Sequence, residues 1–126
     1  MTTAGHRVLA IDHVQLAMPP GAEAEAAALA FFEGLLGLRS VPKPPELAVR
    51  GGCWFERGPV RIHVGAEVDF RPARKAHPAL VVSNLDALCR RLDQAGHPTR
   101  HSEDVPGRPQ WFVDDPFGNR IELLPG

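Results

Sequence analysis

The chain has 126 residues, of which 44% are apolar and 23% charged, a balance typical of a folded domain. Fourteen basic and fifteen acidic side chains give a net charge of −1, which argues against a nucleic-acid partner. The longest uninterrupted apolar run, residues 26–32, is too short to cross a membrane. The N-terminus lacks the charged start and apolar core of a signal peptide, and Cys53 and Cys89 fit no metal-binding spacing. We therefore expect free thiols in a cytoplasmic protein.

Clusters of proline and glycine divide the first half of the chain into predicted elements. The run rich in Ala, Leu and Glu favours a helix, and Gly37 is suited to end it in a left-handed conformation. In chain order the predicted elements are a strand over 8–17, a helix over 22–36, a loop over 42–45, and strands over 51–56 and 60–65 joined by a turn at 57–59.

The second half repeats this order after a linker at about 67–75. The predicted elements are a strand over 77–82, a helix that starts after Ser83 or Asn84 and ends at 96–98, and strands over 111–113 and 120–124. Trp54 and Phe55 align with Trp111 and Phe112 in this repeat. The chain therefore reads as one α+β domain, 1–126, built from two β-α-β-β-β modules, about 6–66 and 76–126.

Residues of the metal-binding types fall at equivalent points of the repeat. In each last strand the aliphatic side chains alternate with polar ones, so His63 and Glu122 are predicted to lie on the face away from the helices. His13 and His77 open the first strand of each half. Imidazole and carboxylate are suitable ligands for zinc, nickel, manganese or iron(II). A hydrogen-bonded structural role is the alternative for each residue taken singly.

Three stretches of the sequence resemble the vicinal oxygen chelate superfamily, which includes glyoxalases, bleomycin resistance proteins and extradiol dioxygenases. They are Asp12-His13, the Phe31-Phe32 pair followed by 35–38, and the segment 115–122, which reads DPFGNRIE. The resemblance spans about 8–124. It implies curved mixed sheets that form a half-open, barrel-like cleft around one metal, with the first and last strands of each module adjacent.

The resemblance also implies roles for single residues. The shared ligand positions map onto His13, His77 and Glu122, and the fourth, a glutamate base in glyoxalases, is His63 here. We expect one divalent ion per cleft (Zn, Ni, Mn, Co or Fe(II)), with His63 as fourth ligand or catalytic base. The candidate substrate-binding residues are Gln15, Arg61, Trp54, Trp111 and Arg120, although each also suits a structural or ion-paired role.

These expectations combine into a glyoxalase-like metalloenzyme that polarises a small oxygenated substrate, as lyases and isomerases of this type do. The chain has no tyrosine, so ring-cleaving dioxygenase chemistry and thiol addition to fosfomycin rank lower. The alternative is a metal-free protein of bleomycin-resistance type that sequesters a small aromatic ligand. We expect a homodimer, because open curved sheets leave edges and a cleft to cover.

Overall fold

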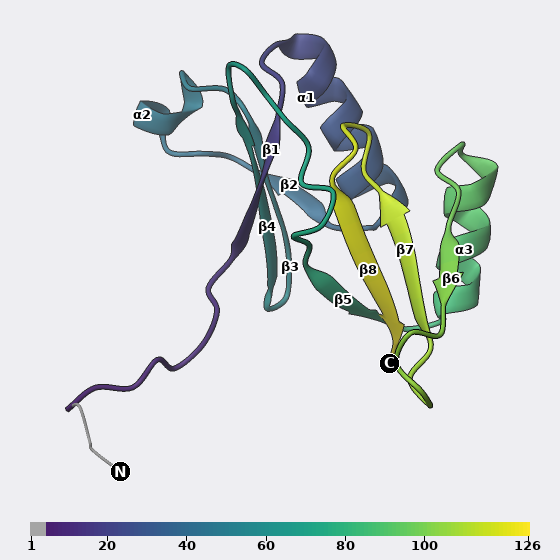
Figure 1. The fold of residues 1–126 in the computed structure, drawn as a ribbon. Coiled ribbons are helices and arrows are strands. Elements are labelled where there is room, and N and C mark those ends of the chain that lie inside the picture. Colours follow the sequence, from purple (N-terminus) through teal and green to yellow (C-terminus); the bar gives the residue numbers. More distant parts are fainter. Residues whose placement is uncertain (1–4) are drawn as a thin grey trace.

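The computed structural model describes residues 5–126 and contains two four-stranded sheets, one from each half of the chain (Figure 1). The first sheet has the order β1-β4-β3-β2 and the second the order β5-β8-β7-β6. The strands are β1 (Val14–Met18), β2 (Arg39–Val41), β3 (Cys53–Arg57), β4 (Val60–Ala66), β5 (Ala79–Val82), β6 (Arg100–Ser102), β7 (Gln110–Asp114) and β8 (Arg120–Pro125).

The repeated order predicted from the sequence is confirmed. In each module the first strand pairs in parallel with the last, and the other neighbours are antiparallel. The helices are α1 (Ala22–Ala28), the π-helix η1 (Leu29–Leu35), the short α2 (Pro45–Ala48) and α3 (Leu85–Gln94). None of the helices within residues 5–126 is long and apolar enough to span a membrane.

The first strand is shorter than predicted. It begins at Val14, while Val8, Leu9 and Ile11 lie before it, are 85%, 82% and 82% exposed, and form an arm that extends away from the sheets (Figure 1). The register explains this, because Val14 pairs with Ile62 and β4 starts only two residues earlier, after the turn. Residues before 12 therefore have no strand beside them within the described chain.

Four other local features differ from prediction. The helix predicted over 22–36 changes at residue 29 from α to π geometry, as the bond from Leu36 N–H to Phe31 C=O shows. The short helix α2 begins at the last residue of the loop predicted over 42–45 and was not predicted. The edge strands β2 and β6 complete the predicted β-α-β-β-β modules, but their positions were not predicted, because each is only three residues long. Asn84 does precede α3, but in a left-handed conformation and without a side-chain capping bond.

The hydrophobic core lies between the helices and one face of each sheet. Phe31 and Phe32 of η1 pack here, and Phe32 stacks on Phe55 of β3 with ring centroids 5.3 Å apart. Alternation along β4 and β8 sends the following aliphatic side chains inward: Ile62, Val64, Ile121 and Leu123. The intervening positions on the opposite faces hold His63 and Glu122.

The loop between β7 and β8 joins the two modules. The buried Asp115 carboxylate accepts hydrogen bonds from the backbone N–H groups of Phe117 and Asn119 and from the Asn119 amide. Asn119 in turn donates to the C=O of Ala17 at 2.8 Å and accepts from the N–H of Ala73 at 2.9 Å. The DPFGN segment therefore fixes the second module against β1 and the linker.

Candidate functional site

The first candidate half-site consists of His13 and His63 on the open face of the first sheet. Gln15 pairs with His63 across β1 and β4, and His13 precedes it by two residues on the same face. The two imidazole rings stack with centroids 4.1 Å apart. Trp54 of β3 stacks on the other side of His63, with centroids 4.1 Å apart and an interplanar angle of 7°. We call His13 and His63 the module-one half-site.

An acidic neighbour orients His13. Its Nδ1–H donates to Asp12 Oδ2 at 2.9 Å, which leaves Nε2 as the nitrogen available to a ligand. This hydrogen bond is the main reason that the pKa of Asp12 lies below its ordinary value, and the nearby Arg61 guanidinium adds to the effect. A carboxylate on the remote nitrogen is the usual support for a metal-binding histidine.

His63 differs in having its ring buried, with 7% of the residue exposed. Burial lowers the pKa of His63, and the positive charge that His13 can carry lowers it further. The imidazole is therefore neutral near neutral pH. A neutral imidazole can bind a metal or accept a proton, so both predicted roles remain chemically open.

The second candidate half-site pairs His77 with Glu122, which we call the module-two half-site. His77 Nε2 lies 2.9 Å from Glu122 Oε1. Its Nδ1–H donates to the C=O of Lys75 at 2.6 Å, and the Gln110 amide donates to Glu122 Oε2 at 2.8 Å. Burial alone would raise the pKa of Glu122, but the bonds from His77 and Gln110 outweigh it and lower the pKa.

The hydrogen bonds of the module-two half-site require a proton or a metal ion that its two members share. Because a carbonyl oxygen only accepts, Nδ1 of His77 must carry the proton toward Lys75. A neutral His77 would then direct an Nε2 lone pair at the ionised carboxylate of Glu122, and two acceptors do not bond. Either a proton on Nε2 or a metal ion satisfies both groups.

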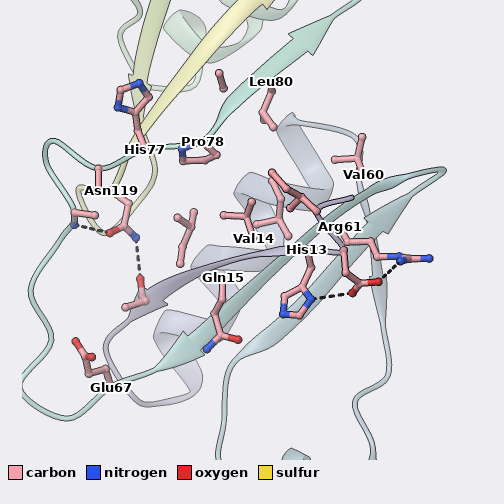
Figure 2. Close-up of a pocket in the computed structure, with 18 of the residues that line it drawn as sticks. His13, Val14, Gln15, Val60, Arg61, Glu67, His77, Pro78, Leu80 and Asn119 are labelled. Carbon is pink, nitrogen blue, oxygen red and sulfur yellow. Dashed lines mark hydrogen bonds and ion pairs between the residues drawn. The ribbon is translucent and has the colours of Figure 1, made fainter. Parts of the chain in front are cut away.

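The two half-sites are not brought together in one chain. His13 and His77 lie on different sides of a cavity of about 830 Å³ between the edges of β1 and β5 (Figure 2), and His63 and Glu122 do not line it. Among residues 5–126, no group of three or more His, Cys, Asp or Glu side chains is arranged to hold a metal ion. The donor types suit a divalent metal, but each half-site supplies only two donors.

Two of the candidate substrate-binding residues lie beside the module-one half-site. Gln15 and Trp54 flank His63 in the same cross-strand row. Arg61 precedes His63 by two residues on β4. Its Nη1 lies 2.8 Å from Asp12 Oδ1, and its Nε lies 3.6 Å from Glu56 Oε1. The guanidinium of Arg61 is therefore ion-paired in this structure.

The other two candidates have different surroundings from those expected. The Arg120 guanidinium lies over the Phe112 ring, 5.2 Å from its centroid. Trp111 pairs with the fully buried Leu123 and packs against the core, so it lies on the helix side of its sheet, away from Glu122. The second hairpin is one residue longer than the first, so Phe112 takes the place equivalent to Trp54.

Sequence reasoning gave no role to three groups of these half-sites. Asp12 was part of a quoted motif, and its position next to His13 was the signal that it could orient the ring. Gln110 shares a face with Phe112, and the one-residue error in aligning the two hairpins hid it. The Lys75 group is a backbone carbonyl, so its role could not be predicted from the residue type.

The family follows from comparison with known proteins. Residues 10–123 match the model of the glyoxalase/bleomycin resistance protein/dioxygenase superfamily. The chain belongs to this superfamily. The resemblance seen in the motifs is thereby confirmed, and so is the α+β fold of two modules with open sheets. None of the proteins of curated function gives a significant match.

Solved structures show the same fold. A protein from Bacillus anthracis described as belonging to the glyoxalase family is 41% identical, with a TM-score of 0.88 over 96% of this chain and 98% of that one. The fosfomycin resistance protein FosX from Listeria monocytogenes is 14% identical, with a TM-score of 0.73 over 95% of each chain. A glyoxalase family protein from Enterococcus faecalis is 21% identical, with a TM-score of 0.64 over 91% and 96%.

Proposed function

We propose that this protein is a glyoxalase-like metalloenzyme in which two copies of the chain each contribute one half-site to a divalent-metal centre. His13 of one copy and His77 and Glu122 of the other would be the ligands, with His63 as fourth ligand or as base. The metal would supply Lewis acidity, polarising an oxygen of a small oxygenated substrate. The reaction would be of lyase or isomerase type.

The observation that carries the proposal is the pair formed by His77 Nε2 and Glu122 Oε1. These atoms are 2.9 Å apart, close enough for both to bind the same metal ion, and the bond from His77 Nδ1 to the Lys75 carbonyl leaves Nε2 as the nitrogen available for it. His13 is held in the same way by Asp12. In both His13 and His77 the Nδ1 atom already has a hydrogen-bond partner, so Nε2 is the atom that can bind a metal.

Two features support a second copy as the source of the missing donors. The cavity between the β1 and β5 edges has apolar walls that include Val14, Ile62, Pro78 and Leu80. The arm with exposed Val8, Leu9 and Ile11 leads directly into His13. Exposed apolar segments beside unpaired strand edges favour association with another chain.

The side chains around the half-sites have separate tasks in this proposal. Trp54 holds the His63 ring in one plane by stacking, and Asp12 fixes the tautomer of His13. If His63 is not a ligand, its neutral imidazole is ready to take a proton from a substrate carbon beside a polarised carbonyl. Gln110 fixes one oxygen of Glu122 and leaves the other for a cation.

The test is metal content after purification without added chelator. The wild-type protein should hold about one divalent ion per chain, and His77→Ala should lose most of it. The matched control is His101→Ala, because His101 is an exposed histidine that contacts Trp111 away from both half-sites. A wild-type protein that holds no metal even after incubation with Mn, Fe, Co, Ni or Zn would contradict the proposal and favour a sequestering protein.

A further inference from the structure

A second small hollow lies on the open face of the first sheet, next to the row that contains His63. Residue Gly65 follows His63 by two positions and so lies on the same face. Gly52 packs so closely against β4 that a Cβ there would lie 2.3 Å from the Val64 carbonyl oxygen. Gly65 therefore adds no side chain to the open face of β4, and Gly52 lets the chain before β3 approach β4 closely.

The segment around α2 and two side chains of the sheet surround this hollow. They enclose a cavity of about 260 Å³ that Gly65 and Ala66 also line. The other lining residues are Gln15, Lys43, Leu47, Arg50, Gly51, Trp54 and Val64. The Gln15 amide extends over Gly65, since a Cβ on Gly65 would lie 2.7 Å from its Nε2.

The polar groups of this cavity are suited to a negative charge. Lys43 and Arg50 are cationic, Gln15 offers amide N–H donors, and none of the lining residues is acidic. Lys43 donates one N–H to the Gly51 carbonyl, which fixes its ammonium at the wall and leaves two further donors. Arg50 forms no ion pair with the residues in the range 5–126.

A carboxylate on the helix side of the sheet lies close to the cavity without lining it. Glu25 lies on α1, close to Gly51, and accepts through its backbone C=O a weak bond from the Cys53 thiol, which points to the helix side. It does not line the cavity. An anion in the cavity would therefore meet Lys43 and Arg50 first.

We propose that this cavity binds the anionic group of the substrate, a carboxylate or phosphate, while the reacting oxygens lie at the metal centre. This rests on the proposed function for the position of the reacting end. Two residues along a strand span roughly 7 Å, which is the separation between the His63 and Gly65 levels. The substrate class is therefore a small oxygenated acid or phosphate ester that extends from the metal centre to this cavity.

The experiment follows anion binding in the presence of a chelator, so that a metal ion cannot bind the anion. Inorganic phosphate and acetate are titrated separately into the isotopically labelled full chain. We expect saturable shifts of the Gly51, Gly52 and Gly65 amides and of the Trp54 indole N–H. Dimethyl sulfone, which is neutral and of similar size, should shift none of them.

Variants test which side chains are responsible. Lys43→Gln and Arg50→Gln should each weaken binding about tenfold, as expected for the loss of one charge-assisted bond. Arg90→Gln, at an exposed position on α3, is the matched control and should bind as the wild type does. All three should keep the wild-type metal content, which separates this proposal from the metal centre. The proposal is overturned if neither anion causes saturable shifts at these groups, or if both cavity variants bind as tightly as the wild type.

Discussion

At the scale of single residues, the two half-sites share one construction. Each contains a histidine whose Nδ1 is bonded to an oxygen, from Asp12 in one module and from the Lys75 carbonyl in the other. In each histidine Nε2 is the nitrogen left for a ligand, and that of His77 faces Glu122. The second member differs, because His63 is a neutral ring between two aromatic groups, whereas Glu122 is an ionised carboxylate held by hydrogen bonds.

The lowered pKa of Glu122 makes stability depend on pH in a defined direction. Its ordinary value is 4.5, and the folded value is lower, so folding favours the ionised form. The stabilisation is fully present above about pH 4.5 and is lost as the pH falls through the folded value.

We therefore expect the metal-free wild type to lose stability more steeply than Glu122→Gln between about pH 5 and about pH 3. Chemical denaturation at a series of pH values measures this. Parallel curves for the two proteins would show that the bonds from His77 and Gln110 do not favour the charged form.

His63 allows a test between ligand and base. If it is a ligand, His63→Ala should weaken metal affinity, by about tenfold or more for the loss of one imidazole. If it is a base, metal affinity should stay unchanged while turnover on a substrate falls. We expect weaker affinity, because His63 occupies the repeat position of Glu122. Competition with a chelator of known affinity measures it, and unchanged affinity would remove His63 from the ligand set.

At the scale of elements, the β7–β8 loop links the second module to β1 and to the linker. The Asn119 side chain bonds to Ala17 of β1, to Ala73 of the linker and to Asp115 of its own loop. Asn119→Ala would leave a buried carboxylate and two backbone groups short of partners. We expect it to lower the free energy of unfolding by about 2–4 kcal/mol, measured by chemical denaturation.

The matched control for Asn119→Ala is Asn84→Gly. Asn84 is exposed, has a φ of 51° and makes no capping bond, so glycine fits its backbone and removes nothing. We expect a change within about 0.5 kcal/mol. An Asn119→Ala protein as stable as this control would show that the loop does not fix the modules together.

The sequence was most informative for elements whose periodicity reflects burial. β4 and β8 alternate aliphatic and polar residues because one face packs on helices, so their faces could be predicted. β2 and β6 are too short to show a period, and the change to π geometry at residue 29 has no signal in composition. The apolar residues at 8–11 suggested a strand, but the length of β4 decides where pairing starts.

The candidate site was predictable in part. The sequence repeat identified His13, His63, His77 and Glu122, and the structure pairs them two by two. The repeat aligns Trp111 with Trp54, one residue out of register in the second hairpin, so the sequence predicted substrate binding for Trp111, which lies on the helix side of its sheet. The separation of the half-sites could not be predicted, because it depends on contacts between segments that are distant in the sequence, such as the bond from Asn119 to Ala17.

At the scale of the whole molecule, a single chain presents two incomplete donor pairs, an apolar cavity between strand edges and an exposed apolar arm. In a twofold dimer the same contact forms twice. Each donor pair is then completed by the other copy, and the second chain covers the cavity and the arm. Light scattering at micromolar concentration should therefore report the mass of two chains. A chain that stays monomeric would contradict the shared centre.

Metal binding in a mixed dimer tests the shared centre most directly. One chain carries His13→Ala with His63→Ala, the other carries His77→Ala with Glu122→Gln, and different tags allow the mixed dimer to be isolated. Neither variant alone should hold metal. If the centre joins half-sites from two copies, the mixed dimer regains one intact centre and holds about half the wild-type metal. If the mixed dimer stays empty while the wild type is loaded, the ligands come from one chain and the account is contradicted.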